Sequence, residues 1–389
     1  MSAISRRVLV PFGTRPEIIK LAPVVRALRE ASHDVCTVDT GQHSAAAMGS
    51  ALREELGLPV DVRLELPDGE PAARMGALMM GAVQVVTTRR PDLVLALGDT
   101  HTVPTYALAA RGAGVPFAHL EAGLRSFNQR SVEEVNRRMA AAAAQLHFAP
   151  TRQAGAFLAA EGINEQRIFV VGNPVIDALQ ERGAHAVLPT SRSGVLVTAH
   201  RATNVDDPER LSRLVVLVEA LARQVGRVTF PLHPRTADRL RTFGLYDRLA
   251  TAVGVALCAP LPYDDLLRVL SHSRVVVTDS GGIQEEAAYL GVPVVVLRRS
   301  TPRWEGVTAG STVLSGLTSN DEAARALGAA REMSAPATLQ RIAEQPCPYG
   351  DGTTGVQVAR ILADPATSRL LTLAEPDFTD GVVPGQVAA

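Results

Sequence analysis

The stretch RVVVTDSGGIQEEAAYLGVPVVVL, residues 274–297, constrains the fold of this chain more than any other. The β-branched run at residues 275–277 predicts a buried strand, and the SGG sequence at 280–282 predicts a turn. Residues 283–289 have helical spacing, and residues 292–297 predict a second buried strand. A strand, glycine turn, helix and strand in this order are typical of a parallel sheet, with free backbone N–H groups at the helix start.

The turn in this stretch carries candidate anion-binding residues: Ser280, Gly281 and Gly282. The glycines let a phosphate approach the backbone, and the serine adds a hydroxyl donor. Glu285 and Glu286 follow in the first helical turn, where the helix dipole favours a carboxylate. A carboxylate just past a phosphate cradle can also accept hydrogen bonds from a ribose diol. The stretch therefore predicts a nucleotide site, with an ordinary turn and a capped helix as the alternative.

Length and composition exclude several classes of protein. A chain of 389 residues can form two domains with well-buried cores, and with 46% hydrophobic but only 4% aromatic residues those cores must be mostly aliphatic. The net charge of −1 argues against a nucleic-acid-coating protein. Three widely spaced cysteines without a CxxC motif indicate neither a disulfide framework nor a zinc site. We see no signal peptide and no membrane span, so we expect a soluble, cytoplasmic protein.

Predicted strands alternate with predicted helices in two successive runs along the chain. The strands are expected at residues 8–12, 34–38, 91–97, 115–120, 146–150, 168–172, 195–198, 228–232, 255–259, 275–277 and 292–297. This α/β rhythm predicts two doubly wound parallel-sheet domains, residues 1–172 and 173–365, with a hinge at Gly172-Asn173-Pro174. The tail, residues 366–389, is rich in Pro, Gly and Asp from Pro376 onward, and we expect part of it to be disordered.

Polar side chains gather where the predicted strands end, which is where open α/β sheets bind ligands. These positions are Arg15, Asp99, Glu121, His200, Ser280, Arg303 and Glu305. Thr14 and Glu17 have the spacing of a capping box, which gives Glu17 a structural role. Arg15 lies at the same predicted helix start, where the dipole disfavours a cation unless it faces an anion, so we expect a phosphate clamp.

Lys20 is the only lysine among 39 basic residues. A chain that otherwise uses arginine has reason to keep one lysine where a compact point charge is needed. Chance survival is the alternative interpretation.

The predicted cleft has one wall with carboxylates and cations and another with an imidazole and the phosphate cradle, which suits a nucleotide-sugar. Asp99, Glu121 and Glu133 would shift one another's pKa values apart, so that one carboxyl holds a proton while another accepts one. His200 could serve as an acid or as a charge partner. No activated nucleophile and no metal-ligand spacing are visible, so we expect proton-transfer chemistry without a cofactor or a metal.

These residues lie in motifs that resemble the non-hydrolysing bacterial UDP-N-acetylglucosamine 2-epimerases. The matching stretches are FGTRPEIIKLAPV (12–24), TGQH (40–43), GDT (98–100), HLEAGLRS (119–126), EEVNRR (133–138), HFAPT (147–151), VGNPVIDAL (171–179), TAHR (198–201) and TDSGGIQEEA (278–287). They are collinear over nearly the whole predicted ordered chain, which makes the resemblance specific.

The resemblance implies two Rossmann-like domains of glycosyltransferase-B type facing a central cleft, in a homodimer. It implies interconversion of UDP-GlcNAc and UDP-ManNAc by anti elimination of UDP to 2-acetamidoglucal, followed by re-addition. The positions that match the family's catalytic group are Asp99, Glu121, Glu133 and His200. Those that match its substrate-contacting group are Arg15, Lys20, Ser280, Gly281, Gly282, Glu286 and Arg303. Those that match a second, activating UDP-GlcNAc site are Gln42, Glu134, Arg201 and His233.

The chain departs from the family pattern in three places. It has His200-Arg201-Ala202-Thr203-Asn204 where HRREN is common, and TPRWE at 301–305 where TERPE is common. The QH motif is followed by Ser44–Ala47 without its usual partner. The loss of an arginine and a glutamate leaves open whether a second UDP-GlcNAc still activates the protein.

Three other functions remain open from the sequence. A hydrolysing epimerase would release free ManNAc and UDP. A glycosyltransferase would use the same fold to donate a sugar, although the first half shows no aromatic acceptor platform. A non-catalytic UDP-sugar sensor would keep its function without the carboxylates.

Overall fold

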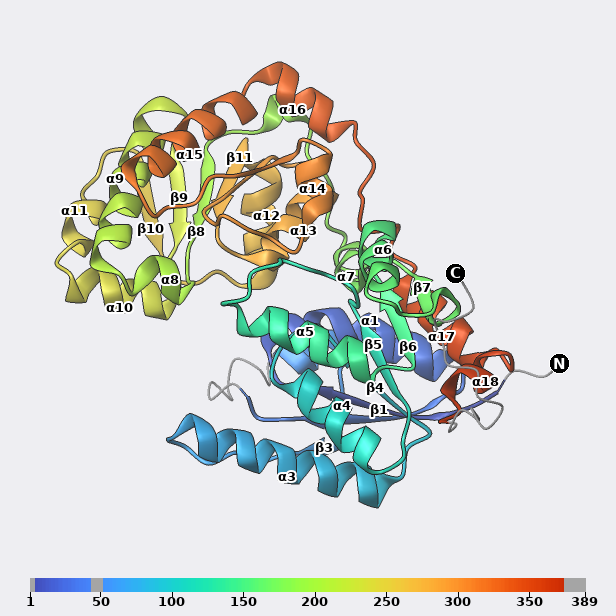
Figure 1. The fold of residues 1–389 in the computed structure, drawn as a ribbon. Helices are drawn as coiled ribbons and strands as arrows, with labels where there is room; N and C mark the ends of the chain where they lie inside the picture. The colour runs from blue at the N-terminus through green and yellow to red at the C-terminus, as the bar shows by residue number, and fades with distance from the viewer. Residues whose placement is uncertain (1–3, 43–51, 374–389) are drawn as a thin grey trace, which may run out of the picture.

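The computed structural model describes residues 4–42 and 52–373, which form two parallel sheets covered by helices on both faces (Figure 1). The predicted α/β class and the two doubly wound units are therefore confirmed. The expected disorder from Pro376 onward concerns positions outside the described residues. Within the predicted tail, α18 (Thr367–Leu371) is helical.

The first sheet has the strand order β3-β2-β1-β4-β5-β6-β7, and each neighbouring pair is parallel. Its strands are β1 (Arg7–Phe12), β2 (Asp34–Asp39), β3 (Val62–Arg63), β4 (Leu93–Leu97), β5 (Phe117–Leu120), β6 (Leu146–Ala149) and β7 (Ile168–Val170). Its helices are α1 (Arg15–Glu30), α3 (Pro71–Arg89), α4 (Thr102–Gly112), α5 (Val132–Ala143), α6 (Arg152–Ala160) and the 3₁₀ helix η1 (Glu165–Arg167).

The side chains of β1 alternate between two cores, as the period of two along a strand requires. Val8, Val10 and Phe12 pack with α1 on one face, whereas Leu9 packs with α3 and α4 on the other. Because both faces are covered, the strand is almost entirely apolar.

The second sheet has the order β10-β9-β8-β11-β12-β13, again parallel throughout. Its strands are β8 (Val195–Thr198), β9 (Val228–Pro231), β10 (Val255–Cys258), β11 (Val275–Thr278), β12 (Val294–Val296) and β13 (Thr312–Leu314). The remaining elements are α7 (Pro174–Glu181), η2 (Pro189–Ser191), α8 (Ala202–Val205), α9 (Pro208–Gln224), α10 (Pro234–Thr242), α11 (Tyr246–Ala250), α12 (Tyr263–His272), α13 (Gly281–Tyr289), α14 (Trp304–Thr308), α15 (Asn320–Met333), α16 (Pro336–Ala343) and α17 (Thr354–Ala363).

The predicted boundaries at 172 and 365 place two helices in the second domain. In the structure these helices pack against α1, which covers the first sheet. These are α7 and α17, and both join the core under β1. The reason is apolar burial, since Val358, Ala359 and Leu362 of α17 are buried in that core. The polypeptide leaves the first sheet after α7 rather than at the predicted hinge, and it returns after α16 (Figure 1).

Each sheet has one topological switch point, where consecutive crossovers go to opposite sides. It lies between β1 and β4 in the first sheet and between β8 and β11 in the second. Ligands of open α/β sheets bind in the crevice beyond the strand ends at such points. Arg15 and Asp99 follow the first pair of strands, and His200 and Ser280 follow the second. The fold therefore brings the predicted site residues to both crevices.

Candidate active site

The side chain of Lys20 connects the two sheets. Its ammonium contacts the carboxylate of Glu121, which follows β5, and lies 2.7 Å from Oε2 of Glu285 on α13. All three side chains are buried. Burial alone would lower the pKa of Lys20, but the two carboxylates raise it above its ordinary value. One compact cation thus compensates a carboxylate from each wall.

Glu121 is held on a second side and adopts an uncommon backbone conformation. The amide Nδ2 of Asn173 donates to its Oε1 at 2.7 Å. Its φ of 64° lies in the left-handed region, which costs free energy for a residue with a Cβ and is found disproportionately at functional sites. Glu121 is therefore fixed by its backbone and by both partners.

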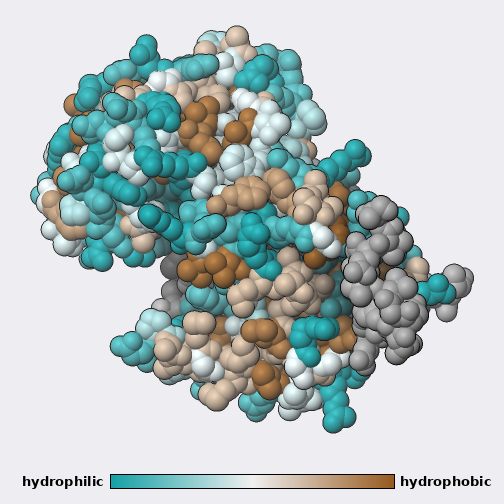
Figure 2. Space-filling view, in the orientation of Figure 1, coloured by the Kyte–Doolittle hydropathy of each residue, from teal (hydrophilic) through white to brown (hydrophobic). Residues whose placement is uncertain are grey.

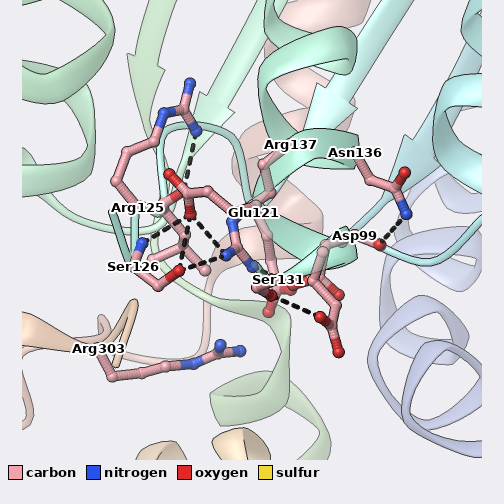
Figure 3. A network of polar contacts seen from close by, with 12 residues as sticks. Asp99, Glu121, Arg125, Ser126, Ser131, Asn136, Arg137 and Arg303 are labelled. Atoms are coloured by element: carbon pink, nitrogen blue, oxygen red, sulfur yellow. Dashed lines mark hydrogen bonds and ion pairs between the residues drawn. The ribbon is translucent and has the colours of Figure 1, made fainter. Parts of the chain in front are cut away.

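Asp99 lies in a polar network with α5 (Figure 3). Its carboxylate pairs with Arg137, and its carbonyl accepts a 2.8 Å hydrogen bond from the Asn136 amide. Arg137 also donates to Glu134 at 2.8 Å, which connects Asp99 to the interior of the first sheet's half. Figure 3 shows Arg303 extending from the second sheet's half toward this network.

Glu133 forms a second ion pair between the walls. Its Oε1 lies 2.5 Å from the guanidinium of Arg201, and the Ser131 hydroxyl donates to its Oε2 at 2.6 Å. Although burial opposes the shift, the Ser131 hydrogen bond and Arg201 lower the pKa of Glu133 to about 2. Glu133 is consequently ionised at neutral pH, and while it is paired with Arg201 it is a weak proton acceptor.

The start of α13 is built to receive an anion. A Cβ on Gly282 would meet no atom within 4 Å, so the backbone there is open to close approach. A Cβ on Gly281 would lie 3.0 Å from Nη1 of Arg303, whose Nε donates to Glu285 at 2.8 Å. A guanidinium at a helix N-terminus is disfavoured by the dipole unless an anion joins it. This geometry fits the phosphate cradle that the SGG sequence predicts.

Two half-buried arginines at the strand ends, Arg15 and Arg298, have no side-chain hydrogen bond or ion pair within residues 4–42 and 52–373. Arg298 follows β12, directly beside the cradle, because Leu297 donates its N–H to the Thr278 carbonyl. Burial, Arg201 and Arg303 together lower the pKa of Arg298 to about 10. Three arginines therefore lie together in this part of the cleft, and Glu133 and Asp279 are the carboxylates that oppose the shift in the pKa of Arg298.

Glu286 points toward a tyrosine instead of a cation. The Tyr263 hydroxyl donates to its Oε1 at 2.8 Å. Burial raises the pKa of Glu286 to about 7, with the neighbouring Glu285 acting in the same direction. A carboxyl in this state can accept or donate a hydrogen bond near neutral pH.

His200 follows β8, and its ring lies beside that of His233 with the ring centroids 5.5 Å apart. Burial lowers the pKa of His200, as do Arg201 and Arg298, whereas Asp279 opposes the shift. The imidazole is therefore neutral at pH 7.

The residues predicted for a second ligand site divide between the walls. Arg201 pairs with Glu133, and His233 lies beside His200. Gln42 instead accepts a 3.0 Å hydrogen bond from Thr102, and Glu134 accepts from the Ser126 N–H at 2.7 Å. Ser44–Ala47 lie outside the described residues. A second-site role for these four residues remains a prediction.

The capping role predicted for Glu17 is confirmed, because its Oε2 accepts from the N–H groups of Gly13 and Thr14, both at 2.8 Å. The sequence placed Glu285 at the start of the helix after the cradle but predicted no contact with Lys20 or Arg303, and it did not single out Arg298. The position of Arg298 directly after a buried strand could have identified it. The role of Glu285 depends on contacts with two distant residues, for which the sequence has no signal.

Within the described ranges, no group of three or more His, Cys, Asp or Glu side chains could hold a metal ion. No helix of the described chain is long and apolar enough to cross a membrane.

Comparison with known proteins gives a consistent match. Residues 26–363 match the family model described as UDP-N-acetylglucosamine 2-epimerase. The Methanocaldococcus jannaschii UDP-N-acetylglucosamine 2-epimerase is 35% identical over 90% of this chain and 97% of its own. A Pseudomonas aeruginosa UDP-2,3-diacetamido-2,3-dideoxy-D-glucuronate 2-epimerase is 36% identical over 92% and 99%.

Solved structures agree with this match. The M. jannaschii enzyme in complex with UDP-GlcNAc and UDP superposes with a TM-score of 0.81 at 34% identity, covering 92% of this chain and 99% of the other. The Neisseria meningitidis UDP-GlcNAc 2-epimerase bound to UDP-GlcNAc also has a TM-score of 0.81, at 30% identity, with the same coverage.

Because the pKa of Glu286 is raised, we expect the free energy of unfolding to depend on pH, and we expect Glu286→Gln to remove this dependence. The native state binds more protons than the unfolded state between its ordinary pKa of 4.5 and about 7. The free energy of unfolding of the wild type should therefore fall, relative to Glu286→Gln, as pH rises through this window, by on the order of 3 kcal/mol. The Tyr263 hydroxyl can still donate to the glutamine. Urea unfolding of both proteins from pH 5 to 8 measures the difference.

The matched control for this experiment is Glu332→Gln, on an exposed part of α15. This variant should track the wild type at every pH. A difference between wild type and Glu286→Gln that stays constant from pH 5 to 8 would contradict the assigned pKa shift.

Proposed function

The chain belongs to the UDP-N-acetylglucosamine 2-epimerase family, and on that premise we propose that it interconverts UDP-GlcNAc and UDP-ManNAc without net hydrolysis. The observation that carries this proposal is the position of Lys20, which contacts both a carboxylate of the first wall and the helix of the phosphate cradle. A single substrate can therefore reach the carboxylates with its sugar while its diphosphate lies at the cradle.

The chemistry of the proposed reaction requires both walls. The C2 hydrogen of the sugar is not adjacent to a carbonyl, so it becomes acidic only as the anomeric C–O bond breaks. A carboxylate takes the C2 proton, UDP leaves with the C–O electron pair, and a C1=C2 double bond forms in 2-acetamidoglucal. Proton delivery to the opposite face of C2 and attack of UDP on C1 then complete the inversion. Both faces of C2 need a proton-handling group.

We assign the proton-handling roles to Asp99, Glu121, Glu133 and His200. The low pKa of Glu133 keeps its carboxylate ionised in the resting state, and Glu121 lies against the ammonium of Lys20. In this proposal His200 is neutral in the resting state, and it acts as an acid or a charge partner after its ring has taken up a proton. Keeping several carboxylates in one cleft lets one act as base while another returns the proton.

We propose that the cations and N–H groups of the cradle bind the departing diphosphate. Arg15, Arg303 and the backbone of residues 280–282 surround the start of α13 and α1, where charge develops on the leaving group. Glu286 is proposed to contact the ribose diol, as its place just past the cradle indicates. Lys20 is proposed to contact substrate while it keeps both walls together.

A second candidate function is epimerisation of another UDP-linked 2-acetamido sugar. The similarity to the P. aeruginosa enzyme, which its name assigns to a diacetamido-glucuronate, favours this candidate. The elimination chemistry would be the same, and only the substituents at C3 and C6 of the sugar would differ.

Deuterium exchange tests the proposed reaction. Incubation of the purified protein with UDP-GlcNAc in deuterated water should place deuterium at C2 and produce UDP-ManNAc, as followed by NMR. Glu121→Gln should slow this exchange by about 10²-fold or more while UDP affinity stays within about threefold. Glu332→Gln again serves as the unaffected control.

The alternatives give different results in the same experiment. Free ManNAc accumulating with UDP would indicate a hydrolysing epimerase, and exchange only with a diacetamido-glucuronate would indicate the second candidate. No exchange at C2 with any of these UDP-sugars would refute epimerisation and favour a transferase or a sensor.

Because the guanidinium of Arg298 has no side-chain partner in the described chain, we expect Arg298→Gln to lower UDP affinity without lowering the stability of the protein. UDP affinity should fall by about 10- to 100-fold, because a charge-assisted hydrogen bond to phosphate contributes about 1.5–3 kcal/mol, whereas uridine affinity should not change. The free energy of unfolding without ligand should stay the same or rise, since the change removes a buried charge that Arg201 and Arg303 also repel. Calorimetric titration and urea unfolding measure the two effects.

The neighbouring Arg299 provides the matched control, because it is exposed and pairs with Glu322 at 2.5 Å. Arg299→Gln should leave UDP affinity unchanged. Equal losses of uridine and UDP affinity in Arg298→Gln would show that this arginine does not bind the diphosphate.

We also propose a homodimer formed through the exposed face of α3, α4 and α5. These helices pack side by side, and Figure 2 shows apolar surface in this region. The exposed apolar residues on them are Met75, Met80, Val83, Leu108, Val132, Val135 and Met139. Extended exposed apolar patches are rare on monomers and mark interaction sites.

Leu108→Glu tests the proposed dimer, because it places a charge in the middle helix of this face. Light scattering during gel filtration should give a dimer mass for the wild type and a monomer mass for the variant. Val253→Glu, which changes an exposed residue on the other sheet's half, should remain dimeric. A monomeric wild type would rule the proposal out.

A further inference from the structure

Asp279 is a fully buried carboxylate to which the proposed chemistry gives no role. It follows β11 and accepts hydrogen bonds from the loop after β8. The N–H of His200 lies 3.1 and 3.2 Å from its two oxygens, and the N–H of Arg201 lies 3.0 Å from Oδ2. The Asn204 amide donates to Oδ2 at 3.1 Å. Asp279 thus holds the loop that carries His200.

The same carboxylate also faces the His200 ring. Its Oδ1 lies 3.4 Å from Nδ1 of the imidazole. An ionised carboxylate can only accept, so it favours the tautomer in which Nδ1 carries the hydrogen. Nε2 then has the lone pair and is the nitrogen that can take up a proton.

Three other side chains lie around the His200 ring. Arg201 on its own loop and Arg298 after β12 are cations, which cannot accept a hydrogen from Nδ1. His233, from the turn between β9 and α10, lies beside the ring with the two ring planes tilted by 34°, and its own Nδ1 accepts from the Arg235 N–H at 3.2 Å. Among these neighbours, Asp279 places a carboxylate oxygen 3.4 Å from Nδ1 and supplies a negative charge that would stabilise a protonated ring.

We propose that Asp279 is a positioning residue, which orients His200 through its Nδ1 and leaves Nε2 to exchange a proton with the substrate or its leaving group. This inference rests on the proposed epimerase function for its kinetic consequences. The tautomer itself is a property of the protein and does not depend on that function.

The direct test is the tautomer of His200 in the wild-type protein. Nitrogen-15 NMR of histidine-labelled protein, with His200 assigned by loss of its signals in His200→Gln, should show the hydrogen on Nδ1 near neutral pH. A hydrogen on Nε2 would overturn the proposal whatever the variants do. This measurement needs no activity, so it stands even if the deuterium experiment refutes epimerisation.

The kinetic test is Asp279→Asn, which keeps the shape but removes the charge. Turnover should fall by about 10²-fold while the KM for UDP-GlcNAc stays within about threefold, and the acid limb of the pH profile should move to lower pH. In a His200→Gln background the same change should cause no further loss of turnover, because Asp279 acts through His200.

The matched control is Asp206→Asn, at the end of the same loop and helix. Asp206 pairs with Arg235 and Arg239 and does not touch His200, so turnover and the pH profile should remain those of the wild type. A purely structural role for Asp279 would instead raise KM together with the loss of turnover, and the loss would persist in the His200→Gln background. Either result would refute the positioning role.

Discussion

The ion pairs of Lys20 are the interaction on which the rest of this structure depends. A buried carboxylate costs several kcal/mol without a partner, and Glu121 and Glu285 approach each other from different sheets. One ammonium between them compensates both charges and fixes the distance between the walls. A planar guanidinium would present a wider fork, which explains the single lysine in an arginine-rich chain.

The cations of the cleft fall into two groups with different consequences. Lys20, Arg201 and Arg303 already pair with carboxylates, so they are held in place before any ligand arrives. Arg15 and Arg298 have no such partner in the described chain, and they keep their full attraction for an incoming anion. A site of this kind is preorganised by the first group and gains its binding energy from the second.

Sequence reasoning predicted the elements of the fold closely because the strands are buried on both faces and read as continuous apolar runs. Residues 195–198 were predicted as a strand and form β8 with the same bounds. The packing of α17 against α1 was not predicted, because amphipathic spacing shows that a helix needs a partner but not which sheet supplies it. The short β3, with two residues, has too little pattern to detect.

The sequence predicted which site residues follow the ends of strands. It predicted much less well which of their side chains contact one another. Motifs located Glu133 and Arg201 but did not show that they form an ion pair, because their contact joins residues 68 positions apart. The departure at 301–305 is the clearest case. Trp304 donates its indole N–H to the carbonyl of Arg125 at 2.8 Å and lies against Phe127 of the first wall. The substituted loop therefore contacts the first wall through Trp304, while the guanidinium of the preceding Arg303 pairs with Glu285 of the second.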